Sequence, residues 1–448
     1  MNDHEGGPAG EQSEGRSGRV PSRRSGVDPF HVMEVIRAAG ERAAAGHEVL
    51  HLEVGQPSSG LPPAAAAAAR AALDSGDPLG YTDANGIGAL RSGIARLYRD
   101  RHDLEIDPSR VTVTTGASAA CVLAFLACFD AGRRVAVTEP GYPCYRQMLS
   151  ALGVEAVPVR VDEQTRFQPT PDRLDELGEI HGLVVASPSN PTGSLLTLDE
   201  LAGLGAWCGD RGAWLIADEI YHGITFDRSA DTALLTDPDA VVIGSFSKYF
   251  SMTGWRLGWM VTPSRLVRPL ELLAQNLMIS PPTISQIAGL AALDDHERLD
   301  VHVRRYAANR DVLAGALRDM GVTRIAPAEG AFYIWADTSA LSPDSVELCR
   351  EWLAELSVAA TPGIDFDPQH GHDWVRFSLA GSTETCRRHP DAWSNGRLRR
   401  RDRRGWRAGC CGATRRRSAA SPRRWAGLRC GPPGPRHGSL PSRRAGRR

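Results

Sequence analysis

SFSKYFSMTGWRLGWM, residues 245–260, contains Lys248, which is the only lysine in this chain of 448 residues. The chain has 52 lysines and arginines in total, and all of them except Lys248 are arginines. Arginine can replace lysine in a surface ion pair, but its guanidinium keeps its charge, whereas an ammonium can lose a proton and become a nucleophile. The surviving lysine therefore indicates a catalytic amine of the kind that forms a Schiff base. The alternative is a surface lysine without a chemical role.

Length and composition indicate a large globular protein. Hydrophobic residues make up 42% of the chain, and no apolar run is long enough to span a bilayer. Residues 1–28 are rich in Gly, Ser, Arg and Glu and lack the apolar core of a secretory signal, so we expect them to be disordered and the protein to be cytoplasmic. The nine cysteines show no CxxC pair and no zinc-like spacing, which predicts reduced thiols and no metal site.

The C-terminal tail differs sharply in composition from the body. Residues 385–448 contain 20 arginines and two acidic residues, so the chain's net charge of −1 hides a very basic tail and an acidic body. The tail has no helical or strand periodicity, and we expect it to be unfolded.

Two explanations of this tail are open. One is a polyanion-binding arm, in which Trp406 and Trp425 could stack on bases, although we expect no specific nucleic-acid partner. The other, which the abrupt change near Glu384 favours, is a shift of the reading frame. In that case the body lacks its final helix, and the small C-terminal part of the fold should be less stable.

Short apolar runs alternate with helical segments along the body. Strand-like runs that end in polar residues, Gly or Pro lie at 111–116, 134–140, 183–190, 214–221, 241–248 and 257–263. A 3.6-residue apolar rhythm marks helices at 117–130 and 197–211. This alternation predicts an α/β fold with a mostly parallel sheet.

Ligands of such sheets bind beyond the carboxyl ends of the strands. The sequence places five polar residues there: Asn190, Asp218, Tyr221, Ser245 and Lys248. From the residues alone, Glu219 is as good an acidic candidate as its neighbour Asp218. The sequence therefore predicts a crevice that converges on the lysine.

Six motifs follow one another in the body: TTGAS, EPGYPCY, ASPSNPTG, IADEIY, the lysine segment and RFSLAG. With them, the chain from about Asp28 to Glu384 resembles the class I/II aminotransferases, fold-type I enzymes that use pyridoxal 5′-phosphate (PLP). The resemblance implies an N-terminal arm and small-domain part at 29–55, a large PLP-binding domain at 56–280 and a smaller α/β domain at 281–384. It implies transfer of an amino group from an amino acid to a 2-oxo acid through a PLP Schiff base on Lys248.

The resemblance also assigns roles around the cofactor ring. Lys248 would move the proton between the substrate Cα and the cofactor. Asp218 would keep the pyridine nitrogen protonated, and Tyr221 and Asn190 would bind the ring oxygen. Tyr142 would stack on the ring face.

The resemblance also implies ligands for the phosphate group and a contact with a neighbouring subunit. The implied phosphate ligands are the TTGAS turn and two residues of the lysine segment: Gly116, Ala117, Ser118, Ser245 and Arg256. Tyr81 resembles the residue that reaches the phosphate of the neighbouring subunit's cofactor, which implies a homodimer with shared sites.

For the substrate, the resemblance implies that Arg376 grips the α-carboxylate, with Gly55 and Asn190 beside it. The amino donor is left open among alanine, aspartate and aromatic amino acids, and the acceptor between 2-oxoglutarate and pyruvate. Two other functions stay open: a PLP-dependent lyase that eliminates or cyclises, and a non-catalytic aminotransferase-like sensor.

Overall fold

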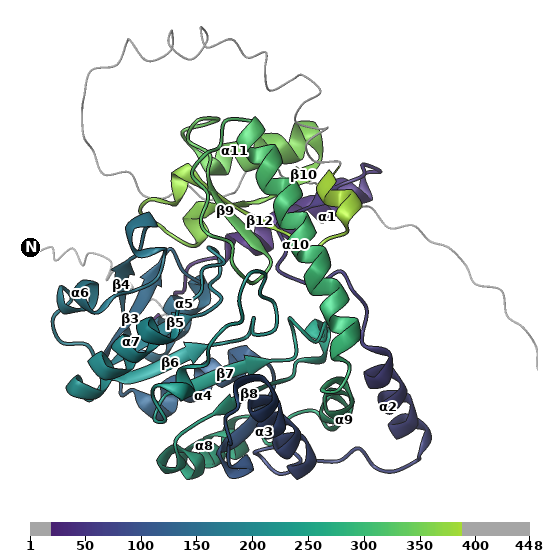
Figure 1. The fold of residues 1–448 in the computed structure, drawn as a ribbon, viewed down its shortest axis with the longest axis vertical. Coiled ribbons are helices and arrows are strands. Elements are labelled where there is room, and N and C mark those ends of the chain that lie inside the picture. The colour runs from purple at the N-terminus through teal and green to yellow at the C-terminus, as the bar shows by residue number, and fades with distance from the viewer. Residues whose placement is uncertain (1–18, 388–448) are drawn as a thin grey trace, which may run out of the picture. The chain divides into compact units, whose positions relative to one another are not determined.

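A seven-stranded sheet forms the centre of the computed structural model, which describes residues 19–387 (Figure 1). Its strands, in spatial order, are β2 (Val111–Thr114), β8 (Gly258–Val261), β7 (Val241–Ser245), β6 (Trp214–Asp218), β5 (Gly182–Ala186), β3 (Arg134–Glu139) and β4 (Glu155–Arg160). The five strands from β7 to β4 are parallel, and β8 runs antiparallel to both of its neighbours. The predicted α/β fold with a mostly parallel sheet is confirmed.

Alternating residues of the central strands enter two different cores. Val184 and Ile243 join a cluster with helices α4 (Ala117–Cys128), α5 (Pro143–Leu152) and α8 (Ser264–Leu277). Leu183 and Val242 join the cluster on the other face, with α3 (Gly88–His102) and α7 (Leu198–Arg211). Both faces of the sheet are covered, which is why its strands read as continuous apolar runs.

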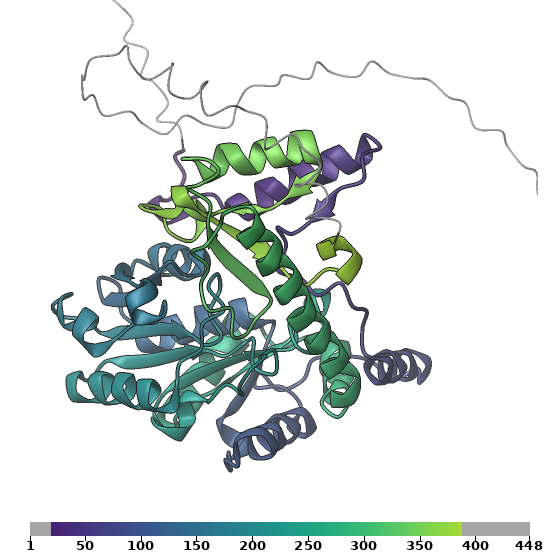
Figure 2. The same cartoon turned by 45° about the horizontal axis from the view of Figure 1, so that its top comes forward.

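A second group of strands is built from the two ends of the described chain (Figure 2). β11 (Thr361–Pro362), β12 (Trp374–Ser378) and β9 (Tyr333–Asp337) form an antiparallel sheet. β1 (Leu50–His51) pairs in parallel with β10 (Val358–Ala359), so residues near position 50 lie beside residues about 300 positions later. The remaining helices are α1 (His31–Ala44), α2 (Pro63–Asp74), α6 (Pro171–Asp175), α9 (Thr283–Ala292), α10 (His296–Asp319) and α11 (Ser345–Glu351).

Helix α1 is attached to this second group through a buried carboxylate. The two oxygens of Asp365 accept hydrogen bonds from the backbone N–H groups of His31 and Val32, both at 2.9 Å. No side chain within the helix caps its N-terminus, so Asp365 satisfies amides that would otherwise be unpaired. α1 is thereby held at the edge of the crevice.

The strands of the large sheet end one to four residues before their predicted ends. The chain then forms loops at the carboxyl edge, although the N–H groups of Ser187 and Glu219, directly after β5 and β6, still donate to the neighbouring strands. Sequence runs show apolar character, but they do not show where ladder hydrogen bonds stop.

Most of the two segments predicted to be disordered lies outside the described residues, but 19–28 are described, and Arg23–Ser25 form a 3₁₀ turn there. Within them, Thr385–Arg387 continue the chain in a helical turn, and Cys386 is buried. Among residues 19–387, no helix is long and apolar enough to cross a membrane.

Close packing of β8 against the start of α4 generates a prediction. A Cβ atom on Gly258 would lie 2.9 Å from the Ala117 nitrogen and 3.0 Å from the Gly244 oxygen, and neither backbone atom can move freely. Gly258→Ala should therefore lower the free energy of unfolding by about 2 kcal/mol. Gly254→Ala, where nothing lies within 4 Å, should change it by less than about 0.5 kcal/mol. Equal costs in denaturant unfolding would contradict this packing.

Candidate active site

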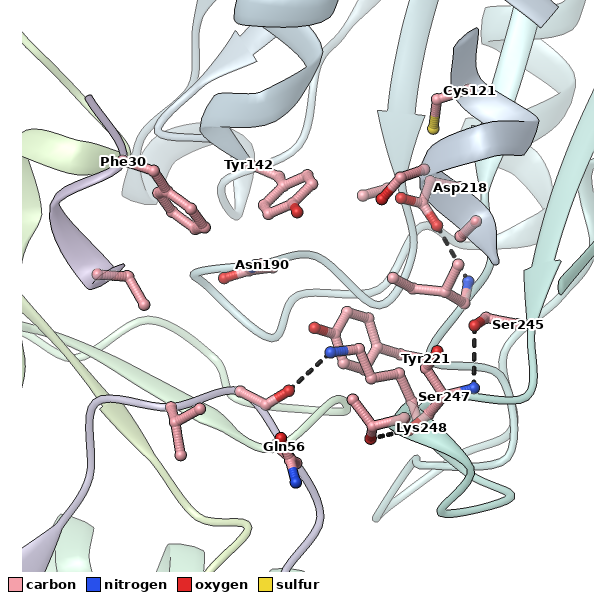
Figure 3. Close-up of a pocket in the computed structure, with 18 of the residues that line it drawn as sticks. Phe30, Gln56, Cys121, Tyr142, Asn190, Asp218, Tyr221, Ser245, Ser247 and Lys248 are labelled. Carbon is pink, nitrogen blue, oxygen red and sulfur yellow. Dashed lines mark hydrogen bonds between the residues drawn. The ribbon is translucent and has the colours of Figure 1, made fainter. Parts of the chain in front are cut away.

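A cavity of about 260 Å³ opens at the carboxyl ends of β5, β6 and β7, facing α1 and the second group of strands (Figure 3). Its walls bring together most of the residues singled out in the sequence: Gly55, Ala117, Ser118, Tyr142, Asn190, Asp218, Tyr221, Ser245, Lys248, Arg256 and Arg376. Two do not line it. Gly116 lies just behind the wall, and Tyr81 is on the surface with 83% of its area exposed.

Lys248 extends into the cavity from the loop after β7. Its Nζ donates a hydrogen bond to the Gly55 carbonyl oxygen at 2.7 Å and lies 5.5 Å from the centre of the Tyr221 ring. Burial lowers the pKa of this amine, and the nearby cation of Arg376 lowers it further. A lowered pKa makes the neutral, nucleophilic form easier to reach.

Asp218 is the last residue of β6 and is almost fully buried. Its carboxylate accepts hydrogen bonds from the Tyr145 hydroxyl and, at 3.1 Å, from the Ile220 backbone N–H. Burial raises the pKa of Asp218 to about 6, against the opposing effects of these two donors and of Lys248. The carboxylate is therefore ionised at neutral pH, with a partner that sequence reasoning missed. Tyr145 closes the motif EPGYPCY, three residues after Tyr142, and this spacing places both on one side of α5.

Tyr221 and Tyr333 form a hydroxyl pair deep in the cavity, with their oxygens 2.8 Å apart. Burial raises the pKa of Tyr221 far above its ordinary value, so the phenol stays a neutral hydrogen-bond donor. A Cβ atom on Gly55 would overlap the Tyr333 hydroxyl, which explains the need for glycine at that position. Tyr333 lines the cavity but was not identified from the sequence, because it lies in β9, which reads as an ordinary buried strand.

Arg376 is 2% exposed and is fixed at three points. It donates to Asn190 Oδ1 at 3.0 Å and to the Glu53 carbonyl oxygen at 2.6 Å, and its guanidinium lies over the Tyr333 ring at 4.3 Å. Its Nε is buried and has no hydrogen-bond partner within the described residues. A buried cation that lines a cavity is suited to a carboxylate.

The opposite end of the cavity is suited to a larger anion. No side chain caps the N-terminus of α4, which begins at Ala117 after Gly116 with φ at +78°. A Cβ atom on Gly116 would lie 2.5 Å from Arg256 Nη2, so glycine leaves room for the guanidinium beside the helix end. Arg256 also donates to the Thr253 carbonyl oxygen at 3.0 Å and lies 3.4 Å from Ser247 Oγ. Backbone amides, a helix dipole, hydroxyls and an arginine together suit a phosphate.

One wall of the cavity is apolar. Side chains of α1 and its flanks provide it, with one residue each from the 52–56 segment and α5: Phe30, Val32, Met33, Ile36, Val54 and Met148. The Phe30 ring meets the Tyr142 ring edge to face at 6.2 Å, and the two lie side by side in Figure 3. None of these six residues was identified from the sequence, because α1 reaches the site only through its tertiary attachment at Asp365.

Comparison with known proteins agrees with this geometry. The sequence profile described as "Aminotransferase class I and II" matches residues 47–391. A valine–pyruvate aminotransferase of Mycobacterium tuberculosis is 47% identical over 363 residues, which are 80% of this chain and 93% of that protein. An aspartate/prephenate aminotransferase of Thermus thermophilus is 32% identical over 82% of this chain and 96% of that protein. The crystal structure of an aminotransferase from Mycobacterium tuberculosis superimposes with a TM-score of 0.82 at 45% identity, covering 84% of this chain and 98% of the other.

The contact between Tyr145 and Asp218 generates a prediction. The hydroxyl stabilises the ionised carboxylate, so Tyr145→Phe should move the pKa of Asp218 to a value above 6. The carboxyl titration can be followed by NMR with labelled aspartate and assigned with Asp218→Asn. Tyr142→Phe removes a neighbouring hydroxyl for which no bond to Asp218 is found, and it should leave the titration in place. An unchanged midpoint in Tyr145→Phe would show that the hydroxyl does not stabilise the charge.

Proposed function

The chain belongs to the class I and II aminotransferases, and from its cavity we propose that the amino donor is an apolar amino acid such as valine, with pyruvate as the acceptor. As a member of this family it is a PLP-dependent enzyme that transfers amino groups between amino acids and 2-oxo acids. The observation that carries the proposed substrate class is the apolar wall of the cavity that Arg376 also lines.

Charge in the cavity argues against an acidic donor side chain. Within the described residues, the cations that line it are Lys248, Arg256 and Arg376. We assign Arg376 to the α-carboxylate and Arg256 to the phosphate, while Lys248 is the reactive amine. No lining cation is then free for a second carboxylate, whereas the α1 side chains offer apolar contact. The valine–pyruvate aminotransferase at 47% identity supports the same donor and acceptor.

The residues fit PLP, as judged by two features of the cavity. Gly116 leaves the space that Arg256 occupies beside the open end of α4, and this end suits the phosphate together with Ser118 and Ser245. At the other end, Arg376 lines the cavity with its buried guanidinium, which suits a carboxylate. When bound, the cofactor supplies an aldehyde for covalent attachment and a ring that withdraws the electron pair left at the substrate Cα.

The protein's own part in the reaction is to hold charge and move one proton. We propose that the ionised Asp218 keeps the ring nitrogen protonated, that Tyr221 and Asn190 bind the ring oxygen and that Tyr142 packs on the ring face. Lys248 would take the proton from the substrate Cα as a general base and deliver it, as a general acid, to the cofactor carbon that carried the aldehyde. The Gly55 carbonyl, 2.7 Å from Nζ, fixes the direction of the amine.

We also propose that the enzyme is a homodimer. Tyr81, Leu277 and Ile279 are all more than half exposed, although each is a large apolar residue. The Thr82 N–H lies 3.4 Å from Ser280 Oγ, which links the loops that carry these residues. An exposed apolar surface of this kind suits a second copy, and the family resemblance assigns Tyr81 to the neighbouring site.

We also propose a division into two domains and a cytoplasmic location. The division into a large domain (56–280) and a smaller one (29–55 with 281–384) is supported by the separate seven-stranded and three-stranded sheets. A cytoplasmic location is supported by the unpaired cysteines within the described residues.

Product assays test the proposed function. With valine and pyruvate the enzyme should form alanine and the 2-oxo acid of valine, at a kcat/KM well above that with aspartate and pyruvate. Met33→Arg places a cation at the exposed rim of the apolar wall, so it should raise kcat/KM for aspartate about tenfold and lower it for valine. Met33→Leu is the matched control and should keep the wild-type preference. A wild-type enzyme that prefers aspartate would overturn the proposed donor.

A further inference from the structure

A second, smaller cavity lies on the other side of the sheet from the site described above. Its volume is about 20 Å³, and it shares no lining residue with the larger cavity. Its walls come from α3, from the turn after β6 and from β7 and β8: Leu97, Tyr98, Arg101, His102, Glu219, His222, Gly244 and Trp259. Most of these side chains are polar or ionisable, and none has a role in the proposed reaction.

Asp218 and Glu219 face opposite sides of the sheet. Asp218 lines the larger cavity and Glu219 the smaller one. The Glu219 N–H still donates to the Ile243 carbonyl oxygen at 2.9 Å, so the backbone remains extended here and adjacent side chains point in opposite directions. The two buried carboxyl groups therefore stand back to back, one residue apart.

Two buried polar atoms at the small cavity have no partner among the described residues. Glu219 Oε1 accepts from Thr232 Oγ1 at 3.0 Å and from the Ala233 N–H at 2.8 Å, but Oε2 has no hydrogen bond. His222 Nε2 is likewise unpaired, and His222 Nδ1 lies 3.4 Å from Glu219 Oε2 without forming a hydrogen bond. A buried water needs about 10–15 Å³ and two to four polar partners, and this cavity offers both.

The groups around Glu219 do not neutralise a negative charge there. Burial lowers the pKa of His102 to about 4 and that of His222 far below its ordinary value, so both rings are neutral. Tyr98 is kept a neutral phenol, because burial raises its pKa. Arg101 lies over the Tyr249 ring at 4.6 Å, and the Tyr249 hydroxyl donates to Asp300 at 2.6 Å. The charge of Asp300 favours the Arg101 cation by raising its pKa, against the opposing effect of burial. Asp218 adds a like charge from the other side.

We propose that the small cavity binds one structural water between Glu219 and His222, and that Glu219 stays protonated. Glu219 is then a positioning residue, because its neutral side chain allows the adjacent Asp218 to be the carboxyl group that ionises. The inference rests on the proposed function only in the role given to Asp218. Glu219 Oε2–H donates to the water, which donates to His222 Nε2. Two adjacent buried carboxyls cannot both ionise cheaply, and the donors Tyr145 and Ile220 favour the charge on Asp218.

The pKa values of the two carboxyl groups agree with a protonated Glu219 and an ionised Asp218. Burial raises the pKa of Glu219 to about 8, against about 6 for Asp218. At neutral pH the structure thus holds one acid and one carboxylate. A buried acid with a raised pKa binds its proton more tightly than the unfolded chain does. Its contribution to stability is complete below the ordinary value of 4.5 and is lost as the pH rises toward 8.

Glu219→Gln is the decisive variant, because its amide mimics the protonated acid and does not titrate. In the full chain without cofactor or substrate, it should match the wild-type melting temperature near pH 5. It should then gain several degrees relative to the wild type by about pH 8. Glu219→Asp, which keeps a titrating group, should show no such pH-dependent gain. A melting-temperature difference that does not change with pH would overturn the proposal.

Infrared spectroscopy of the wild type keeps the test independent of how the variants fold. The carbonyl band of a protonated carboxylic acid should be present at pH 7, disappear as the pH rises through about 8 and be missing in Glu219→Gln. Absence of this band from the wild type at pH 7 would overturn the inference. A crystal structure with an empty cavity would overturn the water site. None of these readouts uses turnover, so their failure would leave the proposed aminotransferase reaction standing, and failure of the valine assay would leave these outcomes unchanged.

Discussion

Burial of opposite charges at the carboxyl edge of the sheet is the constraint on which the rest of this site depends. Lys248, Asp218 and Arg376 are brought into one cavity, where each buried charge must be compensated. Asp218 accepts a hydrogen bond from the Tyr145 hydroxyl, and Arg376 donates to Asn190 Oδ1 and to the Glu53 carbonyl oxygen. These three partners come from separate parts of the chain, so the charges can be held only in the folded protein.

The same constraint connects the two groups of strands. Glu53 and Gly55, which bind Arg376 and Lys248 through backbone oxygens, follow β1, and β1 pairs with β10 from the C-terminal part of the chain. Asp365 also fixes α1 over the cavity, because its side-chain carboxylate accepts hydrogen bonds from backbone amides at the start of that helix. The substrate side chain would therefore meet a wall whose position depends on contacts between residues more than 300 positions apart. Changes that disturb the C-terminal part of the fold should therefore alter the preference for the amino donor as well as lower the stability.

The sequence predicted the central sheet and its chemistry well, for identifiable reasons. Buried parallel strands are apolar runs, and the residues after them, such as Asp218 and Lys248, fall at one edge by topology. Local residues alone could not separate Asp218 from Glu219, because only the direction of the strand decides which of them faces the cofactor cavity. Phe30, Tyr145 and Tyr333 were missed since their roles arise from tertiary contacts that no local pattern encodes. The prediction for the basic tail falls outside the described residues, and the role of Tyr81 stays a prediction.

The absorbance spectrum of the purified protein with PLP, followed by borohydride reduction and peptide mapping, tests the central claim most directly. The cavity predicts a visible band from the bound cofactor, fixation of the cofactor on the peptide that contains Lys248, and loss of the band when valine is added. A well-folded protein that shows no band, or one whose cofactor is reduced onto no lysine, would contradict the account.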